Sequence, residues 1–300
     1  MTLLRRSEIV LVAYFLYAAA LARFLPAPKA TAQTVFLLNL TIIAGCFLLA
    51  YADSLRRRRF LRTVRDWFPL PLLILAYREM GWFATPRHTY DLERSWVVWD
   101  RILLYDLGLR AGIESLGPVF PSVLEIAYSL VYAIPYFALT TLYAYRRGER
   151  ADRYLFPLAL AVLGAYALFP YFPSEPPRTV FPGQDFPSHS TVFRRFNWAL
   201  LSGYGIHTSV FPSAHVSAAF ASALAMRQVL PEAGWVWRLL LAIAILIATA
   251  TVYGRYHYAV DVLAGAALGA GAALLAATRR CSTRPPPARG RASRTTAWLP

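Results

Sequence analysis

Two residues near the C-terminal end of the chain, His257 and Asp261, stand four positions apart at the start of an apolar run. This spacing places both side chains on one face of a helix. A carboxylate one turn inside an apolar segment is costly unless it is paired or functional. We therefore expect Asp261 to orient the imidazole of His257 and to stabilise its charged form. A shared metal ion is an alternative interpretation, although no Glu-x-x-His or Cys-based ligand set accompanies the pair.

A second histidine, His215, lies in the sequence Phe-Pro-Ser-Ala-His, which opens another apolar run. Proline and serine are typical of a helix start, and the free N–H groups of such a start favour an anion. We expect Ser213 to cap this helix and His215 to lie in its first turn. The alternative is a hydrated histidine at a membrane interface.

Two arginines are candidate ligands of a phosphate group. Arg178 ends the proline-rich segment 173–178, which cannot continue a helix, and Arg255 stands two residues before His257. A guanidinium can hold phosphate oxygens through two parallel hydrogen bonds. For Arg178 the alternative is snorkelling of its charge to the membrane interface.

Membrane helices are expected to position these residues. Of the 300 residues, 57% are hydrophobic and 16% are charged, whereas a soluble domain is about one-quarter charged. Apolar runs of about 20 residues can cross the hydrocarbon core. They predict an all-α polytopic bundle of about eight spans, at residues 8–25, 32–51, 67–84, 121–145, 154–172, 211–230, 234–252 and 258–277. The first span has a signal peptide as its alternative interpretation, because arginines precede it and a small-x-small pattern ends it.

The distribution of charge predicts the orientation of the chain. Most of the 31 Lys and Arg residues fall before the first span, on alternate connections, or after the last span. Basic connections mark the cytoplasmic side, so both termini should be cytoplasmic, and the net charge of +15 does not indicate nucleic-acid binding. All five histidines then fall in or beside connections on the other side: His88, His189, His207, His215 and His257. We expect an active site on the non-cytoplasmic face of a bacterial inner or plasma membrane.

An Arg at one span end, Pro-Ser-x-His opening the next span and His-x-x-x-Asp opening a third together resemble the phosphatidic acid phosphatase type 2 superfamily. The resemblance covers about residues 120–277. It implies a six-helix catalytic core, placed here at 67–277. Residues 1–66 would add two N-terminal helices and a basic loop. The Arg- and Pro-rich segment 278–300 should be a disordered tail. The 85–120 connection is expected to form an interfacial helix or a re-entrant lid.

The resemblance also implies roles for the candidate residues. His257 would be the nucleophile that forms a phosphohistidine, His215 the acid that protonates the leaving group, and Asp261 the partner of His257. Arg178 and Ser213 would hold the phosphoryl oxygens. The implied substrate is a phospholipid or lipid phosphate drawn from the bilayer, with no metal ion and no cofactor. The oligomeric state is not implied.

Departures from the phosphatase motifs favour a transferase. Tyr171, Ala214 and Thr251 stand where the hydrolytic branch has a Lys, a Gly and an Arg. The Pro-Pro-Arg segment, the Pro-Ser-x-His without Gly and the tyrosines around His257 resemble the inositol phosphorylceramide synthase branch, with sphingomyelin synthases as more distant relatives. We therefore expect a transferase of phospho-headgroups between lipids. A lipid phosphate phosphatase, acting on phosphatidate or a polyprenyl phosphate, is the main alternative, and a non-enzymatic transporter is a weaker one.

Overall fold

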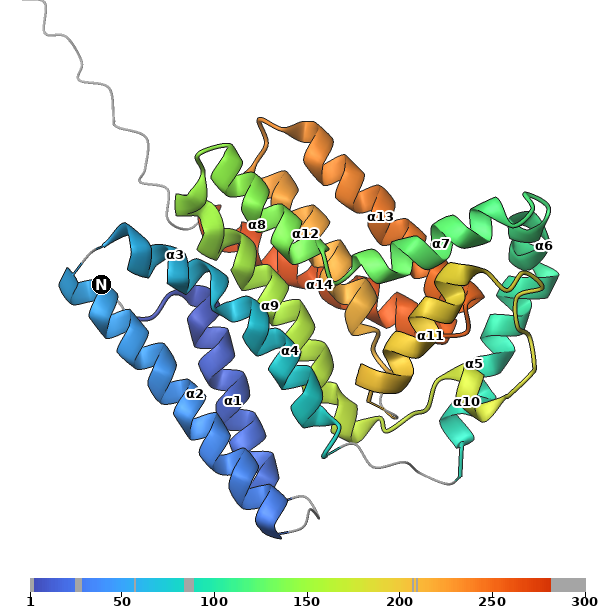
Figure 1. Cartoon of the computed structure of the whole chain (residues 1–300), viewed down its shortest axis with the longest axis horizontal. Helices are drawn as coiled ribbons and strands as arrows, with labels where there is room; N and C mark the ends of the chain where they lie inside the picture. Colours follow the sequence, from blue (N-terminus) through green and yellow to red (C-terminus); the bar gives the residue numbers. More distant parts are fainter. Residues whose placement is uncertain are drawn as a thin grey trace, which may run out of the picture.

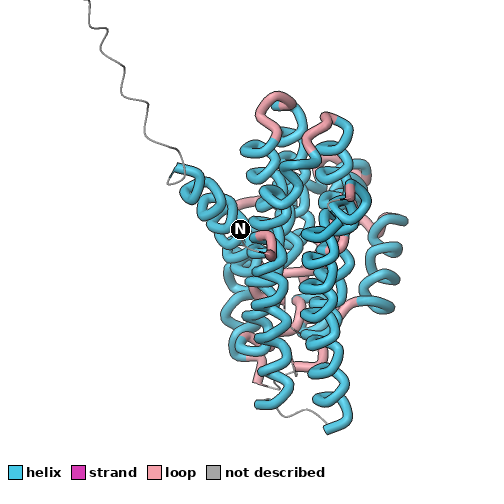
Figure 2. Tube along the Cα trace, turned by 90° about the vertical axis from the view of Figure 1, so that its left-hand side faces the viewer, coloured by secondary structure: helices cyan, strands magenta, loops and turns pink. Residues whose placement is uncertain are grey.

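The structure is a computed structural model that describes residues 3–24, 29–56, 58–83, 89–206, 208 and 210–281. Across these residues every regular element is a helix and none is a strand (Figure 2). Several of the helices are long and apolar enough to cross a membrane. The predicted all-α polytopic membrane bundle is therefore confirmed.

Helices occur at all eight predicted span positions, but they differ in length. Within the described ranges, five long apolar helices could each cross a membrane: α1 (Arg6–Phe24), α2 (Lys29–Arg56), α9 (Ala151–Leu168, with a 3-10 turn at each end), α13 (Gly234–Tyr253) and α14 (Ala259–Cys281). A sixth is counted if α7 (Val119–Leu130) and α8 (Ile134–Ala144), bent by 70°, form one broken span. Two further helices, α4 (Pro69–Met80) and α12 (Ala214–Val229), have 12 and 16 residues, fewer than the roughly 20 of a full span.

The bend between α7 and α8 lies inside the predicted span 121–145. Pro135 occupies the first turn of α8, where its missing N–H costs nothing but an unbroken helix could not continue through it. Residues at this break, Val131 and Tyr132 among them, line the cavity described below as the candidate active site. The break therefore shapes the wall of that cavity.

Helix α12 lies at the centre of the bundle, packed against α9, α13 and α14. A Cβ atom added at Gly265 of α14 would overlap the carbonyl oxygen of Ser213, and one added at Gly269 would lie 2.6 Å from the carbonyl oxygen of Ser217. Only glycine permits so close an approach of two backbones. The backbone N–H of Ser213 also donates to the carbonyl of Asp261 at 3.0 Å. The helix start with His215 is thereby fixed against the helix start with Asp261.

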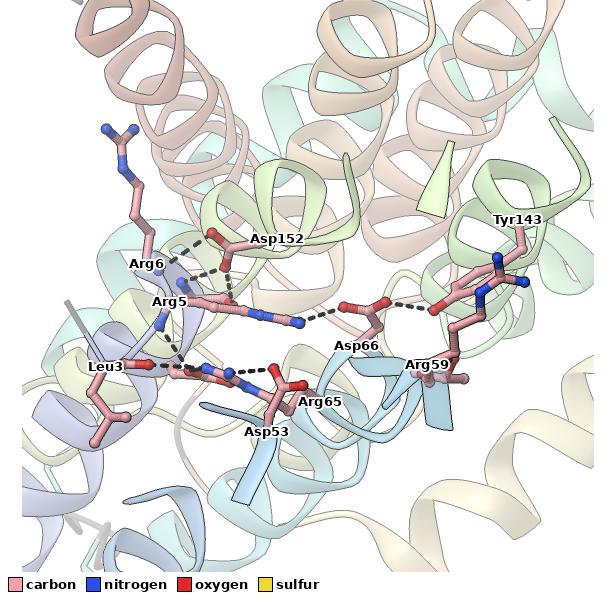
Figure 3. Close-up of polar contacts among 12 residues, drawn as sticks. Leu3, Arg5, Arg6, Asp53, Arg59, Arg65, Asp66, Tyr143 and Asp152 are labelled. Carbon is pink, nitrogen blue, oxygen red and sulfur yellow. Dashed lines mark hydrogen bonds and ion pairs between the residues drawn. The ribbon is translucent and has the colours of Figure 1, made fainter. Parts of the chain in front are cut away.

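A polar cluster joins the N-terminal helices to the rest of the bundle (Figure 3). Arg65 of α3 (Arg59–Trp67) donates to Glu8 of α1 at 2.6 and 2.7 Å and to Asp53 of α2 at 2.8 Å. Asp152, in the first turn of α9, accepts two hydrogen bonds from Ser7 of α1. Helix α1 also packs along α2, α4 and α9, so it is an integral helix of the bundle in this structure.

The 85–120 connection contains α5 (Asp91–Arg101), a short π-helix (Ile102–Asp106) and α6 (Leu109–Glu114). In Figure 1, α5 and α6 lie at one side of the bundle together with α10 (Pro177–Val180) and α11 (Val192–Tyr204). Helix α5 packs against α10 and α14. At the C-terminal end, α14 continues to Cys281, and the remainder of the predicted tail lies outside the described residues.

Candidate active site

Three of the predicted site residues line one cavity of about 230 Å³: His215, His257 and Arg178. The two imidazole rings face each other edge to face, with centroids 5.8 Å apart. They come from different elements, His215 from the first turn of α12 and His257 from the loop between α13 and α14. Close packing of α12 on α14 is what brings them together.

The hydrogen bonds of His257 fix the tautomer of its ring. Nδ1 lies 3.0 Å from the carbonyl oxygen of Val210 and 3.4 Å from Oδ2 of Asp261. A carbonyl oxygen only accepts, so Nδ1 carries the hydrogen, and Nε2 of the neutral ring keeps its lone pair. Asp261 is fully buried and also accepts from the N–H of Tyr258 at 2.8 Å. An unprotonated Nε2 is the form that a nucleophilic histidine requires.

The environment of His257 keeps the ring neutral. Burial, reinforced by the positive charge of Arg178, lowers the pKa of His257 to about 3. Desolvation disfavours the charged form of an imidazole, and a nearby cation acts in the same direction. The residue is 7% exposed. The ring is therefore uncharged across the physiological pH range in the absence of a bound anion.

Aromatic residues hold His215 in place. Its ring stacks on that of Tyr128, with centroids 5.0 Å apart and an angle of 11° between the planes, and Tyr132 meets it edge to face at 5.7 Å. The Tyr132 hydroxyl lies 3.4 Å from Nε2 of His215. His215 therefore has no carboxylate partner among these contacts, in contrast to His257.

Arg178 provides the positive charge of the cavity. Its guanidinium lies over the ring of Tyr256 at 5.6 Å, and Nη1 donates to the Tyr256 carbonyl at 3.4 Å. Within the part of the chain that the structure describes, no carboxylate forms an ion pair with Arg178, and no acidic side chain lines the cavity. An unneutralised guanidinium beside two histidines is suited to an anion.

The structure places the two remaining candidates, Ser213 and Arg255, outside the cavity wall. The Ser213 hydroxyl caps α12 by accepting from the N–H of Val216 at 3.4 Å, as the sequence predicted. Arg255 is completely buried, and its Nη1 forms an ion pair with Asp100 of α5 at 2.5 Å. Its positive charge is thus paired with that carboxylate, and its expected role as a second phosphate clamp stays a prediction.

Sequence reasoning missed the residues that support the site. Tyr128 stacks on both His215 and Tyr256, and Glu125 of α7 accepts from the Tyr256 hydroxyl at 2.6 Å. Glu125 also forms a buried ion pair with Arg194 of α11. An acidic residue inside the apolar run 121–145 was the available signal, because such residues in spans are usually paired or functional.

His189, the other histidine within the described residues, does not line this cavity. His189 lines a separate surface hollow with residues 188 and 190–193. His88 and His207 lie outside the described residues. Of the three histidines that the structure describes, His215 and His257 therefore meet at one cavity, and the clustering of all five on one side of the membrane stays a prediction.

The rest of the cavity wall is mainly apolar and aromatic. It is formed by residues of α4, the break between α7 and α8, and α9, among them Leu70, Leu73, Ile74, Tyr77, Tyr136, Leu158, Val162 and Tyr166. A cavity that combines one cation and two histidines with a mainly apolar wall matches an amphipathic molecule with a small anionic head.

Comparison with known proteins identifies the family to which the chain belongs. The PAP2 superfamily matches residues 97–275, a range that includes every candidate site residue. A PA-phosphatase related-family protein of Dictyostelium discoideum is 50% identical over 54 residues, which are 18% of this chain and 9% of that protein. The chain thus matches less than a tenth of that relative's length. No solved structure matches the chain. Because the family match covers more than half of the chain, this protein belongs to the PAP2 superfamily.

Proposed function

We propose that this protein is a membrane phosphotransferase that moves a phospho-headgroup from one lipid to another through a phosphohistidine on His257. One observation carries the proposal: His257, whose Nε2 keeps its lone pair, His215 and the guanidinium of Arg178 line one cavity whose other residues are mainly apolar and aromatic. The apolar wall supports a lipid as substrate, and the two histidines with Arg178 support a phosphoryl group as the reacting part.

The proposed reaction has two displacements at phosphorus. In the first, Nε2 of His257 attacks phosphorus, the bond to the oxygen of the donor lipid breaks, and His215, which is protonated in the complex with the anionic donor, gives its proton to that oxygen. In the second, His215 takes the proton of an acceptor hydroxyl, the hydroxyl oxygen attacks phosphorus, and the bond from phosphorus to Nε2 breaks. Arg178 holds the non-bridging oxygens throughout. Asp261 and the Val210 carbonyl stabilise the charge that develops on the ring. Neither step requires a metal ion or a cofactor.

Transfer to a lipid is supported over hydrolysis by the charge and burial of the site. A phosphodiester carries one negative charge where a monoester carries about two, and the described cavity wall holds one arginine and no lysine. His257 is almost completely shielded from solvent, which limits the access of water to a phosphohistidine.

Hydrolysis of a lipid phosphate is the second candidate function. It is favoured by the relative from Dictyostelium discoideum, which is described as PA-phosphatase related. The same phosphohistidine serves both reactions, and only the acceptor differs.

A product analysis distinguishes the two reactions. Purified protein in detergent would be given phospholipid donors labelled in the headgroup phosphate, with and without ceramide or diacylglycerol. We expect a new labelled lipid that requires the acceptor, and none with His257→Ala. Free phosphate or free phospho-headgroup, formed equally with and without acceptor, would establish the hydrolase instead.

The roles of the two histidines make a separate prediction. His257→Ala should abolish both turnover and any trapped phosphoenzyme, because it removes the attacking atom. His215→Ala should reduce turnover by about 100- to 10,000-fold, the usual contribution of general acid–base catalysis. Donors with good leaving groups should recover most of the loss of His215→Ala but none of that of His257→Ala. Turnover by His257→Ala at the wild-type rate would disprove the mechanism.

A further inference from the structure

One face of α5 contacts all three segments that carry the site residues. Glu93, Trp96 and Asp100 lie on this face, at the spacing of successive helical turns. Glu93 accepts from the N–H of Glu175, three residues before Arg178, at 2.9 Å. The ring of Trp96 lies 5.2 Å from that of Phe211, in the segment that opens α12, and 5.6 Å from that of Tyr258.

Asp100 forms the most direct of these contacts, because it bridges the two sides of His257. One carboxylate oxygen pairs with the guanidinium of Arg255, two residues before the histidine. The other accepts from the backbone N–H of Ala259, two residues after it, at 2.7 Å. The side chains of Asp100 and Arg255 are both 0% exposed. The carboxylate thus fixes the backbone on both sides of the nucleophile.

The loop needs such support because its backbone is in an unfavourable conformation. Arg255 has a φ of 63°, in the left-handed region that is uncommon for residues other than glycine. Its guanidinium is buried, and the nearest carboxylate after Asp100 is Asp185, at 3.8 Å. Without the charge of Asp100, a buried cation would lose its close partner, and the loop could relax to another backbone conformation that moves the ring of His257.

We propose that Asp100 is a positioning residue: through Arg255 and the Ala259 N–H, it holds the 254–258 loop so that Nε2 of His257 points into the cavity. In this role α5 is a part of the catalytic framework and not only a cover at the membrane interface. The inference rests on the proposed function of His257 as the nucleophile. Asp100 itself lies outside the cavity wall and touches no substrate.

The test compares Asp100→Asn with a matched control on the same helix, Asp91→Asn, whose side chain is exposed. The asparagine keeps the size of the side chain and an acceptor for Ala259, but it removes the charge that faces Arg255. In single-turnover experiments with labelled donor, we expect the rate of phosphoenzyme formation to fall about 10- to 100-fold, as small misplacements of a reacting group do. KM and the final amount of phosphoenzyme per folded protein should stay within about twofold of wild type. Asp91→Asn should match wild type in all three.

A purely structural role would give a different result. If Asp100→Asn lowers only the folded fraction, with the rate per active site unchanged, the positioning role is overturned. Asp100→Glu, which restores the charge, should recover part of the rate and thereby support the role.

A second measurement does not depend on activity. In protein with ¹⁵N-labelled histidine, the ring nitrogens of His257 should show one tautomer, with hydrogen on Nδ1, in wild type and Asp91→Asn. Asp100→Asn should show a mixture of tautomers or broadened signals at His257, with His189 unchanged. An unchanged His257 spectrum in Asp100→Asn overturns the inference. If instead the spectrum changes but wild type forms no phosphoenzyme, the positioning role stands and the proposed function fails.

Discussion

At His257, two oxygen atoms compete for one ring nitrogen. The Val210 carbonyl is nearer to Nδ1, at 3.0 Å, than Oδ2 of Asp261, at 3.4 Å. The tautomer is therefore fixed by a backbone group that no side-chain substitution removes. In the proposed mechanism, Asp261 acts mainly through its negative charge once the ring of His257 has become cationic.

This geometry predicts a limited effect of Asp261→Asn. In a serine-protease triad, the corresponding change selects the wrong tautomer and costs about 10,000-fold. Here Val210 continues to hold the hydrogen on Nδ1, and an asparagine oxygen can still accept from Tyr258. We expect a loss of about 100- to 1,000-fold in the rate of phosphoenzyme formation, measured in single-turnover experiments on monodisperse protein. A loss as complete as that of His257→Ala would show that Val210 does not fix the ring.

The neutral state of His257 predicts an unusual pH dependence. An exposed histidine has a pKa near 6.5, whereas burial and Arg178 lower that of His257 to about 3. A lowered pKa extends the range of the neutral, nucleophilic form towards acid. With a phosphodiester donor, which has no ionisation near neutrality, kcat/KM should show no loss due to His257 between pH 7 and about 5.

Arg178→Gln provides the control for this pH profile. Removing the cation should raise the pKa of His257 and move the acid limb of kcat/KM to higher pH. The acid limb of this variant should still lie at a lower pH than that of an exposed histidine, because burial lowers the pKa of His257 more than Arg178 does. An acid limb near pH 6.5 in the wild-type protein would contradict the neutral-nucleophile interpretation.

At the scale of elements, the contact between α12 and α14 sets the distance between the two histidines. Gly265→Ala adds a methyl group against the Ser213 carbonyl, so the start of α12 must move away from α14. We expect a destabilisation of about 1–3 kcal/mol, typical of overpacking, together with a lower kcat as the two rings separate. Gly271→Ala on the same helix is the control, since nothing lies within 4 Å of the added carbon.

Thermal unfolding and turnover of the two variants in detergent check this prediction. Alanine favours a helix over glycine, so Gly271→Ala should be as stable as wild type or slightly more so. If Gly265→Ala and Gly271→Ala had the same unfolding temperature and the same turnover, neither stability nor activity would require the close approach of α12 to α14.

Local features of the sequence predicted the helices and the site residues on them. The cap at Ser213 and the proximity of His257 to Asp261 both follow from spacings within one segment. Arg178 also lies after the end of α9, as the proline-rich segment 173–178 indicated. These features depend on residues a few positions apart, which is the range over which sequence patterns are informative.

The supporting contacts could not be predicted, because they depend on how distant helices pack. Arg255 is near His257 in sequence, but its left-handed backbone and the position of α5 pair it with Asp100, 155 residues away. The stack of Tyr128 on His215 likewise joins two helices, α7 and α12, that are distant in the sequence. The shortness of α4 and α12 was hidden by apolar residues that extend beyond each helix.

At the scale of the whole molecule, the polar cluster around Arg65 and the candidate active site lie at opposite ends of α9. The first turn of α9 contributes Asp152 to the N-terminal cluster of Figure 3, and the segment after its last turn leads to Arg178. Eighteen helical residues separate these ends, a length of about 27 Å, close to the thickness of a hydrocarbon core. The site and the cluster around Arg65 should therefore face opposite sides of the membrane.

The excess of basic residues predicts which end of the bundle faces the cytoplasm, and cysteine labelling tests this orientation. Connections rich in Lys and Arg stay in the cytoplasm, and the cluster around Arg65 belongs to such a connection, whereas the 173–210 segment with Arg178 lies at the other end. In a background with Cys46→Ala and Cys281→Ser, Ser190→Cys should react with a membrane-impermeant maleimide in intact cells. Glu149→Cys, exposed at the end of the N-terminal cluster, should react only after the cells are permeabilised. The reverse pattern would place the histidines in the cytoplasm, and donor and acceptor lipids would then have to come from the inner leaflet.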